Sequence, residues 1–257
     1  MANLIRNAKS GSHWTHNELK AYNIIVDYQD AATFFGQPLP NPPVHPDLLN
    51  YLSADDQTDD EAFILLRLME LAMVPRPTQE SATDDFTAHL LKILGYAPRP
   101  RVIRTRNDIP FLICGEYRKA RTDVCILSRD GINLVVQEDK RHFEIMEPLP
   151  QLVAEAIAAF QDNNATCARV LRQPPITSKV MAGIEMTGTF PKFYKIPVTE
   201  ELVTGVETAQ YPANTTIVHG HIPEIPRPTK GEEEGMVPLD NRRVILACFE
   251  AFKQFVN

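Results

Sequence analysis

Asp123, Glu138 and Lys140 have the side-chain types and the spacing that phosphodiester cleavage needs. Two carboxylates can hold Mg²⁺ or Mn²⁺, because these hard cations prefer oxygen ligands. Such an ion polarises a phosphoryl oxygen and acidifies its bound water. A nearby lysine can orient the attacking water or stabilise the negative transition state, and the backbone carbonyl of Asp139 could add an oxygen ligand. The residue types therefore predict a metal site at Asp123, Glu138 and Asp139, with Lys140 beside the attacking water.

The strand expected over residues 132–140 carries Glu138 and Lys140 on one face. Because side chains alternate between the two faces of a strand, three apolar residues lead into this pair on the same face: Ile132, Leu134 and Val136. The register therefore favours Glu138 and Lys140 over Asp139 and Arg141 as the inward set. A Glu-X-Lys sequence is also common by chance, and the alternative is a salt bridge beside a turn, which contributes about 0 to 1 kcal/mol if exposed.

The elements around this site alternate between helical and strand patterns. The apolar residues of 81–94 form one helical stripe, and a strand-like period starts at Arg101. The expected elements are a helix over 81–94, strands over 102–106, 111–117, 121–127 and 132–140 with turns at 107–108 and 129–131, a helix over 148–160, an antiparallel pair over 180–186 and 190–198, a helix over 199–209 capped by Thr199, an exposed loop over 222–235, and a last helix from its N-cap Asp240 to about 255. This order predicts an α/β fold in which helices sandwich a central mixed β-sheet.

The first 80 residues have a different character. Residues 13–36 suggest a short helix and an extended stretch, and the prolines of 37–47 predict an extended connector because they remove backbone donors. A helical pattern follows to residue 74. We predict that residues 1–80 form a helical and extended addition packed on the core, and that residues 81–257 form the α/β core with its C-terminal helix.

The chain resembles the PD-(D/E)XK nuclease superfamily in Thr122-Asp123, in Glu138-Asp139-Lys140 on the next expected strand, and in the helix that follows over 151–160. Many family members have proline where Thr122 stands, but that position varies freely. The resemblance covers residues 84 to about 186, which is less than half of the chain. It implies a restriction-endonuclease-like core of a helix, three strands, a helix and a strand, with helical additions at both ends.

For function, the resemblance implies Asp123 and Glu138 as metal ligands and Lys140 as the catalytic lysine. The activity implied is that of a nuclease that depends on Mg²⁺ or Mn²⁺ and takes DNA rather than RNA as its substrate. One alternative is an inactive nuclease-like fold that binds nucleic acid or protein without cutting. Another is a protein-binding adaptor that uses the proline-rich stretch 37–46.

A second resemblance, to a group of proteins from mushroom-forming (basidiomycete) fungi, rests on two other segments. These are Gly188-Thr189-Phe190-Pro191-Lys192-Phe193-Tyr194 and Pro238-Leu239-Asp240-Asn241-Arg242-Arg243. This resemblance covers most of the chain. It implies no activity.

Additional polar residues could serve the same site. Gln151 and Glu155 are one helical turn apart, so both can face it, and some superfamily members use a helix glutamine there; Gln151 is the predicted accessory catalytic residue. The alternative is a polar pair on the surface. Glu80, Asp84 and Asp85 stand where family members often place another acid, but helix N-termini attract acids in any protein.

Positively charged residues lie on both sides of Asp123 in the sequence: Arg99, Arg101, Arg104, Arg106, Arg118, Lys119, Arg121, Lys140 and Arg141. They could form a patch that follows phosphates. The alternative is an ordinary solvated strand face balanced by Asp108, Glu116 and Glu144.

Composition limits the classes of protein to consider. The net charge of -7 argues against a protein that coats nucleic acid nonspecifically. No apolar run approaches the roughly 20 residues of a membrane span, so no membrane partner is expected. The scattered cysteines suggest free thiols in a reducing compartment: Cys114, Cys125, Cys167 and Cys248. An intracellular location, cytoplasmic or nuclear, is therefore expected.

Overall fold

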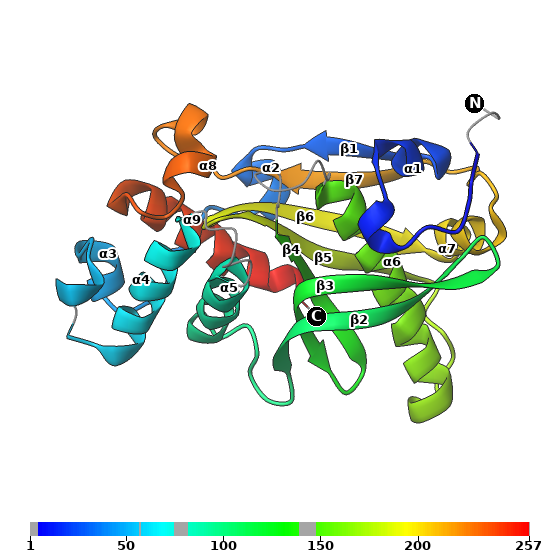
Figure 1. Ribbon diagram of the computed structural model, residues 1–257, viewed down its shortest axis with the longest axis horizontal. Helices are drawn as coiled ribbons and strands as arrows, with labels where there is room; N and C mark the ends of the chain where they lie inside the picture. Colours follow the sequence, from blue (N-terminus) through cyan, green and yellow to red (C-terminus); the bar gives the residue numbers. More distant parts are fainter. Residues whose placement is uncertain (1–4, 57, 75–81, 139–147, 257) are drawn as a thin grey trace.

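A seven-stranded mixed sheet forms the centre of the computed structural model, which describes residues 5–56, 58–74, 82–138 and 148–256 (Figure 1). Its strand order is β1-β7-β6-β5-β4-β3-β2. The pairs β1–β7 and β4–β5 are parallel, and the other neighbouring pairs are antiparallel. The strands are β1 (Ile24–Tyr28), β2 (Val102–Ile113), β3 (Glu116–Ser128), β4 (Gly131–Glu138), β5 (Ser178–Thr187), β6 (Phe190–Thr199) and β7 (Thr216–His221).

Helices cover both faces of this sheet (Figure 1). One apolar core joins the sheet to α6 with α1 and α7, and the other joins it to α4, α5 and α9. The α-helices of the described ranges are α1 (His16–Ala21), α2 (Ala31–Phe35), α3 (Asp47–Asn50), α4 (Asp60–Ala72), α5 (Ala82–Ile93), α6 (Pro148–Thr166), α7 (Glu200–Thr208), α8 (Gly231–Glu234) and α9 (Leu239–Phe252). The predicted α/β fold, a central mixed sheet between helices, is confirmed.

The strand β4 is buried on both faces. Leu134 and Val136 pack in the core of α5 and α9, whereas Val135 packs against α6. Gln137, which follows on the α6 side, is also buried. Leu134 and Val136 therefore lie on the predicted face, but the prediction is wrong for Ile132. Ile132 packs in the core of α6, because the pairing of β3 with β4 shifts register between Ile126 and Leu127. The opposite face of the strand is as deeply buried as that of Leu134 and Val136.

The predicted turn at Asn107-Asp108 is wrong, because residues 102–113 form one uninterrupted strand, β2. Asn107 pairs with Thr122 and Asp108 with Arg121 in the antiparallel ladder with β3. The side chain of Asp108 also binds Arg121 and Lys119 of that neighbouring strand. These cross-strand contacts outweigh the local preference of Asn and Asp for turns.

The hairpin turn between β2 and β3 lies at Cys114-Gly115 instead. Both residues have positive φ, 50° and 76°, which is the backbone of a two-residue hairpin loop. Their N–H groups donate to the carbonyls of Val206 and Glu207 in α7, at 2.9 and 2.7 Å. The turn is therefore held against α7.

Predictions for the C-terminal part are confirmed in some elements and wrong in others. The antiparallel pair β5–β6 is confirmed, and Thr199 caps α7 by accepting a hydrogen bond from the backbone N–H of Leu202. The N-cap of α9 is Pro238 rather than Asp240, because proline suits the start of a helix and the Asp240 carboxylate binds Arg227. The expected loop 222–235 contains the short helix α8.

Candidate metal centre

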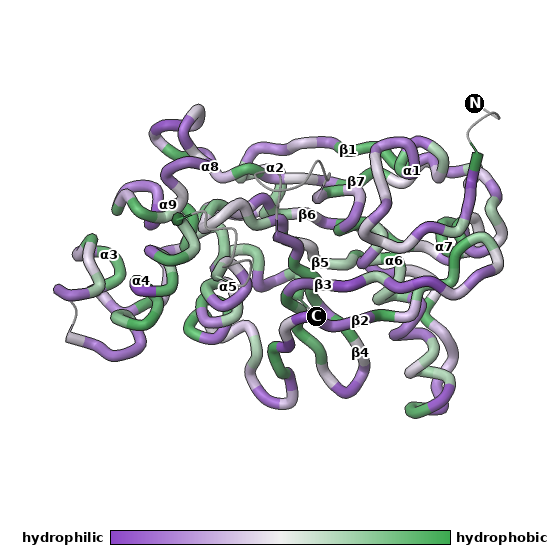
Figure 2. Tube along the Cα trace, viewed as in Figure 1, coloured by the Kyte–Doolittle hydropathy of each residue, from purple (hydrophilic) through white to green (hydrophobic). Residues whose placement is uncertain are grey.

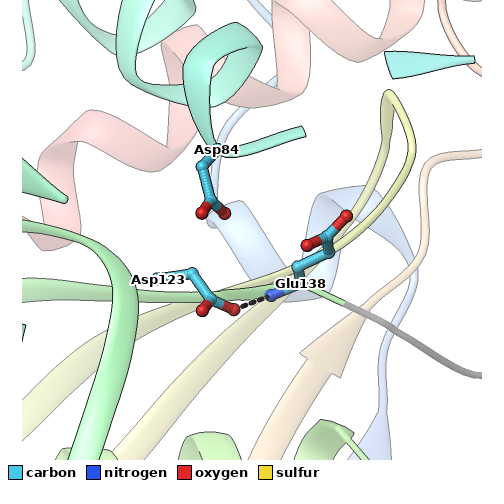
Figure 3. Close-up of side chains that lie close together, drawn as sticks. All are labelled: Asp84, Asp123 and Glu138. Atoms are coloured by element: carbon cyan, nitrogen blue, oxygen red, sulfur yellow. Dashed lines mark hydrogen bonds between the residues drawn. The ribbon is translucent and has the colours of Figure 1, made fainter. Parts of the chain in front are cut away.

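Three carboxylates from three different elements meet at one end of the central strands. Asp84 lies in the first turn of α5, Asp123 lies on β3, and Glu138 ends β4 (Figure 3). One carboxylate oxygen from each residue lies within 4.8 Å of the other two. Asp84 and Asp123 are only 6% and 7% exposed, and Glu138 is half-buried. Such a set of converging oxygens is the ligand type that Mg²⁺ and Mn²⁺ prefer.

The Asp123 carboxylate has a fixed orientation. Its Oδ2 accepts a hydrogen bond from the backbone N–H of Glu138 at 2.8 Å (Figure 3). The same oxygen accepts a second hydrogen bond from Nε2 of Gln137 at 2.7 Å. Both donors belong to β4, so the ligand on β3 is aligned by the neighbouring strand. An oriented carboxylate loses less conformational freedom when it binds a cation.

The Asp84 carboxylate lies near one arginine of β2. Nε of Arg106 is 3.9 Å from Oδ2 of Asp84. Arg106 has a positive φ of 52° and a largely exposed side chain. Its guanidinium offsets part of the repulsion between three close carboxylates, as does the positive N-terminal end of the α5 dipole.

A chain of buried side chains runs from Asp123 to α6. Oε1 of Gln137 accepts a hydrogen bond from Nε2 of Gln151 at 2.8 Å, and the same amide donates to Oε1 of Glu155 at 3.2 Å. The alternative that Gln151 and Glu155 form a surface pair is wrong, because Gln151 is buried and Glu155 is fully buried. Both residues belong to α6 and lie among its buried residues.

Burial determines the charge of Glu155. Removal from water raises the pKa of its carboxyl well above the usual range, and the nearby charge of Asp123 raises this pKa further. The hydrogen bond from Gln151 has the opposite, smaller effect. Burial therefore favours the neutral form of Glu155 next to the Asp123 carboxylate.

The structure brings together two of the residues predicted from the sequence, Asp123 and Glu138. Asp139 and Lys140 lie outside the described residues, as does Glu80. Asp85 points to solvent, whereas Asp84 joins the cluster. The helical period contained the signal for that difference, because Asp84 shares a face with Thr87 and Leu91, three and seven positions later, and both are buried.

Gln137 has a central place that the sequence reasoning missed. Its amide contacts Asp123, Gln151 and the backbone carbonyl of Glu138. Strand alternation placed Gln137 on the face opposite Glu138, and this position is correct. The sequence could not show that α6 buries this face of β4. Once buried there, the Gln137 amide makes its hydrogen bonds with protein groups.

The basic residues are spread along the β2–β3 hairpin, and several form ion pairs there. Lys119 and Arg121 both bind Asp108, and Arg118 binds Glu116. Of the three acids expected to balance these basic residues, Asp108 and Glu116 thus form ion pairs with them. Lys140, Arg141 and Glu144 lie outside the described residues.

Comparison with models of protein families and with curated proteins found no match for this chain. Among the helices of the described ranges, none combines the length and the apolar character that a membrane span requires.

Proposed function

We propose that this protein is a metal-dependent nuclease of the PD-(D/E)XK type, with Mg²⁺ or Mn²⁺ held by Asp84, Asp123 and Glu138 and with DNA as its substrate. The observation that carries the proposal is the convergence of these three carboxylates from α5, β3 and β4. A supporting observation is the element order α5-β2-β3-β4-α6-β5. It is the order of helix, three strands, helix and strand that a restriction-endonuclease-like core has.

Each residue has a role in this proposal. Asp84, Asp123 and Glu138 hold the cation, which supplies charge stabilisation at the phosphate and a more acidic water. Gln137 holds Asp123 in the orientation described above. Lys140, two residues after Glu138, orients the attacking water. In the hydrolysis the water oxygen bonds to phosphorus, the bond from phosphorus to the leaving sugar oxygen breaks, and a proton ends on that oxygen.

The first prediction concerns cleavage. Purified protein should cut plasmid and oligonucleotide DNA in Mg²⁺ or Mn²⁺. Lys140→Ala and Asp123→Asn should each lower the rate at least a hundredfold, the order of effect expected when an electrostatic group of an active site is lost. The measurement is the initial rate of strand cleavage on gels, with EDTA as the blank.

Asp85→Asn is the control, because it makes the same change as Asp123→Asn at an exposed position that follows Asp84 directly in α5. Cleavage that persists in Lys140→Ala or Asp123→Asn would come from another site or a contaminant. If the wild-type protein binds the cation but cuts no substrate, the chain is an inactive nuclease-like fold.

We also propose that the protein works inside the cell. The four cysteines Cys114, Cys125, Cys167 and Cys248 carry free thiols, and reducing compartments keep thiols in this form.

A further inference from the structure

The β2–β3 hairpin has an outward face that combines positive charge with an exposed aromatic ring. Three cross-strand pairs lie on it: Leu112 with Tyr117, Pro110 with Lys119, and Asp108 with Arg121. The residues that alternate with these pairs include Ile109, Phe111 and Ala120, which are buried on the α6 side. Because side chains alternate along a strand, the three pairs face away from α6, and hydrophilic residues follow one another along this part of the hairpin (Figure 2).

The side chains of this face are well exposed. Tyr117 is 74% exposed, and the side chains of Lys119 and Arg121 are 75% and 63% exposed. An open surface pocket of about 550 Å³ lies beside the ring. It is lined by Tyr117, Pro110, Lys119 and Asp108 of this face, together with Ser10 and with Ile109 and Arg118, which are the next residues along the two strands. A flat ring, a proline and an ammonium at one pocket can receive a planar base and its phosphate.

The two strands of the hairpin lead to the candidate metal centre. Arg121 is two residues before Asp123 on β3, and Arg106 on the partner strand lies beside Asp84. Asp123 is six positions after Tyr117 on β3, which is roughly 20 Å along the strand, a length that a few nucleotides of an extended strand can cover.

We propose that the hairpin face formed by Tyr117, Lys119 and Arg121 binds one unpaired strand of nucleic acid. A base enters the pocket beside Tyr117, and the backbone passes Lys119 and Arg121 toward the metal centre. The path of the nucleic acid toward the metal centre rests on the proposed function. Its binding to the hairpin does not require the metal.

Two features favour an unpaired strand over a duplex or a protein partner. The ring of Tyr117 can stack only on a base whose face is open, and bases within a duplex are stacked on each other. Lys119 and Arg121 lie in one row along β3. Asp108 lies beside them on β2 and repels phosphates that approach across that strand. A single polyanion that follows this row complements the charge of the face.

The test is the binding of short fluorescent oligonucleotides, measured by anisotropy in EDTA at low salt. The wild-type protein should bind single-stranded DNA or RNA more tightly than the matching duplex. Tyr117→Ala should weaken binding about tenfold, the order expected for one lost stacking contact, and Tyr117→Phe should restore it. Lys119→Ala with Arg121→Ala should reduce the slope of log K against log salt by about 0.7 for each lost phosphate contact.

Asp108→Asn should tighten binding, because it removes the carboxylate that Lys119 and Arg121 share. The matched control is Lys20→Ala with Lys230→Ala, which removes the same charge from exposed positions outside the hairpin. These two substitutions should leave the affinity unchanged. Circular dichroism confirms that each variant is folded.

The proposal is overturned if the hairpin variants bind like the wild type, if no oligonucleotide binds at low salt, or if the duplex binds as tightly as the single strand. Failure of the nuclease proposal looks different. Binding in EDTA that depends on Tyr117 and Lys119, without cleavage in Mg²⁺, would overturn the proposed function and keep this inference. Cleavage in Mg²⁺, together with hairpin variants that bind like the wild type, would overturn this inference and keep the proposed function.

Discussion

Gln137 connects the candidate metal centre to the interior of the protein. Its amide group donates to Asp123 and accepts from Gln151, which in turn contacts Glu155. A glutamine can carry both contacts because its side chain has a donor and an acceptor. The position of the proposed metal ligand Asp123 on β3 thus depends on Gln137 of β4 and on the buried polar side chains that α6 itself supplies.

The buried Glu155 makes the stability of the fold depend on pH. Its pKa in the folded protein is raised from 4.5, so the folded protein keeps this proton after the unfolded chain has released it. Stability is therefore fully present below about pH 4.5 and falls as pH rises toward the folded pKa. Glu155→Gln cannot ionise, so its melting temperature should decrease less than that of the wild type between about pH 5 and pH 8.

Glu200→Gln is the control for this measurement, because Glu200 is an exposed acid in the first turn of α7. It should keep the wild-type pH profile in differential scanning calorimetry. Equal pH profiles for Glu155→Gln and the wild type would show that Glu155 is ionised in the folded protein.

At the scale of elements, the turn between β3 and β4 is tied to α6. Asn163 of α6 accepts from the N–H of Ile132 at 2.6 Å and donates to its carbonyl at 2.9 Å. Gly131, with φ of 125°, leaves the room for this contact, since a Cβ there would lie 2.0 Å from Oδ1 of Asn163. The turn and the helix therefore fix the start of the strand that ends in Glu138.

Gly131→Ala should lower the free energy of unfolding by about 3 kcal/mol or more, because it adds a collision with Asn163 to the strain of positive φ. Gly115→Ala is the matched control. It has a positive φ of 76° but open space around its Cβ position, so only the strain of about 1 to 2 kcal/mol should appear. Urea unfolding of the two variants measures the difference, and equal losses would contradict the role given to Asn163.

The strands near the site show what the sequence could predict. Alternation along residues 134–138 predicted the position of Glu138, and the paired β-branched segments predicted β5 and β6, whereas the register shift opposite Ile132 could not be predicted. Asn107-Asp108 misled the prediction, because a local turn preference cannot reveal the partner strand that Asp108 contacts. The helical period could have placed Asp84 on the buried face of α5, but the role of Gln137 needed knowledge of packing, since it follows from where α6 meets the sheet.

At the scale of the whole molecule, a cation at the candidate centre would join three separate elements. Asp84, Asp123 and Glu138 come from α5, β3 and β4, so binding stabilises their mutual arrangement. At a hundredfold excess over Kd, Mg²⁺ or Mn²⁺ should add about 2.7 kcal/mol to the stability, or roughly 5 to 10 °C in melting temperature.

Asp84→Asn and Asp123→Asn should lose most of this shift in a thermal melt, whereas Asp85→Asn should keep it. An equal shift in all four proteins would mean that the ions act on the acidic surface in general, since the chain carries a net charge of -7.

The parallel pairing of β1 with β7 has a consequence for synthesis. Ile24 pairs with Thr216 and Tyr28 with Gly220, and β1 is an edge strand whose described neighbour is β7. During translation about 190 residues must follow β1 before its partner exists, which takes roughly 10 to 40 seconds at ordinary ribosome speeds. Throughout that interval the backbone N–H and C=O groups of β1 lack the partner strand β7, so β1 can pair with another polypeptide. The sheet is thus completed only after translation has passed β7.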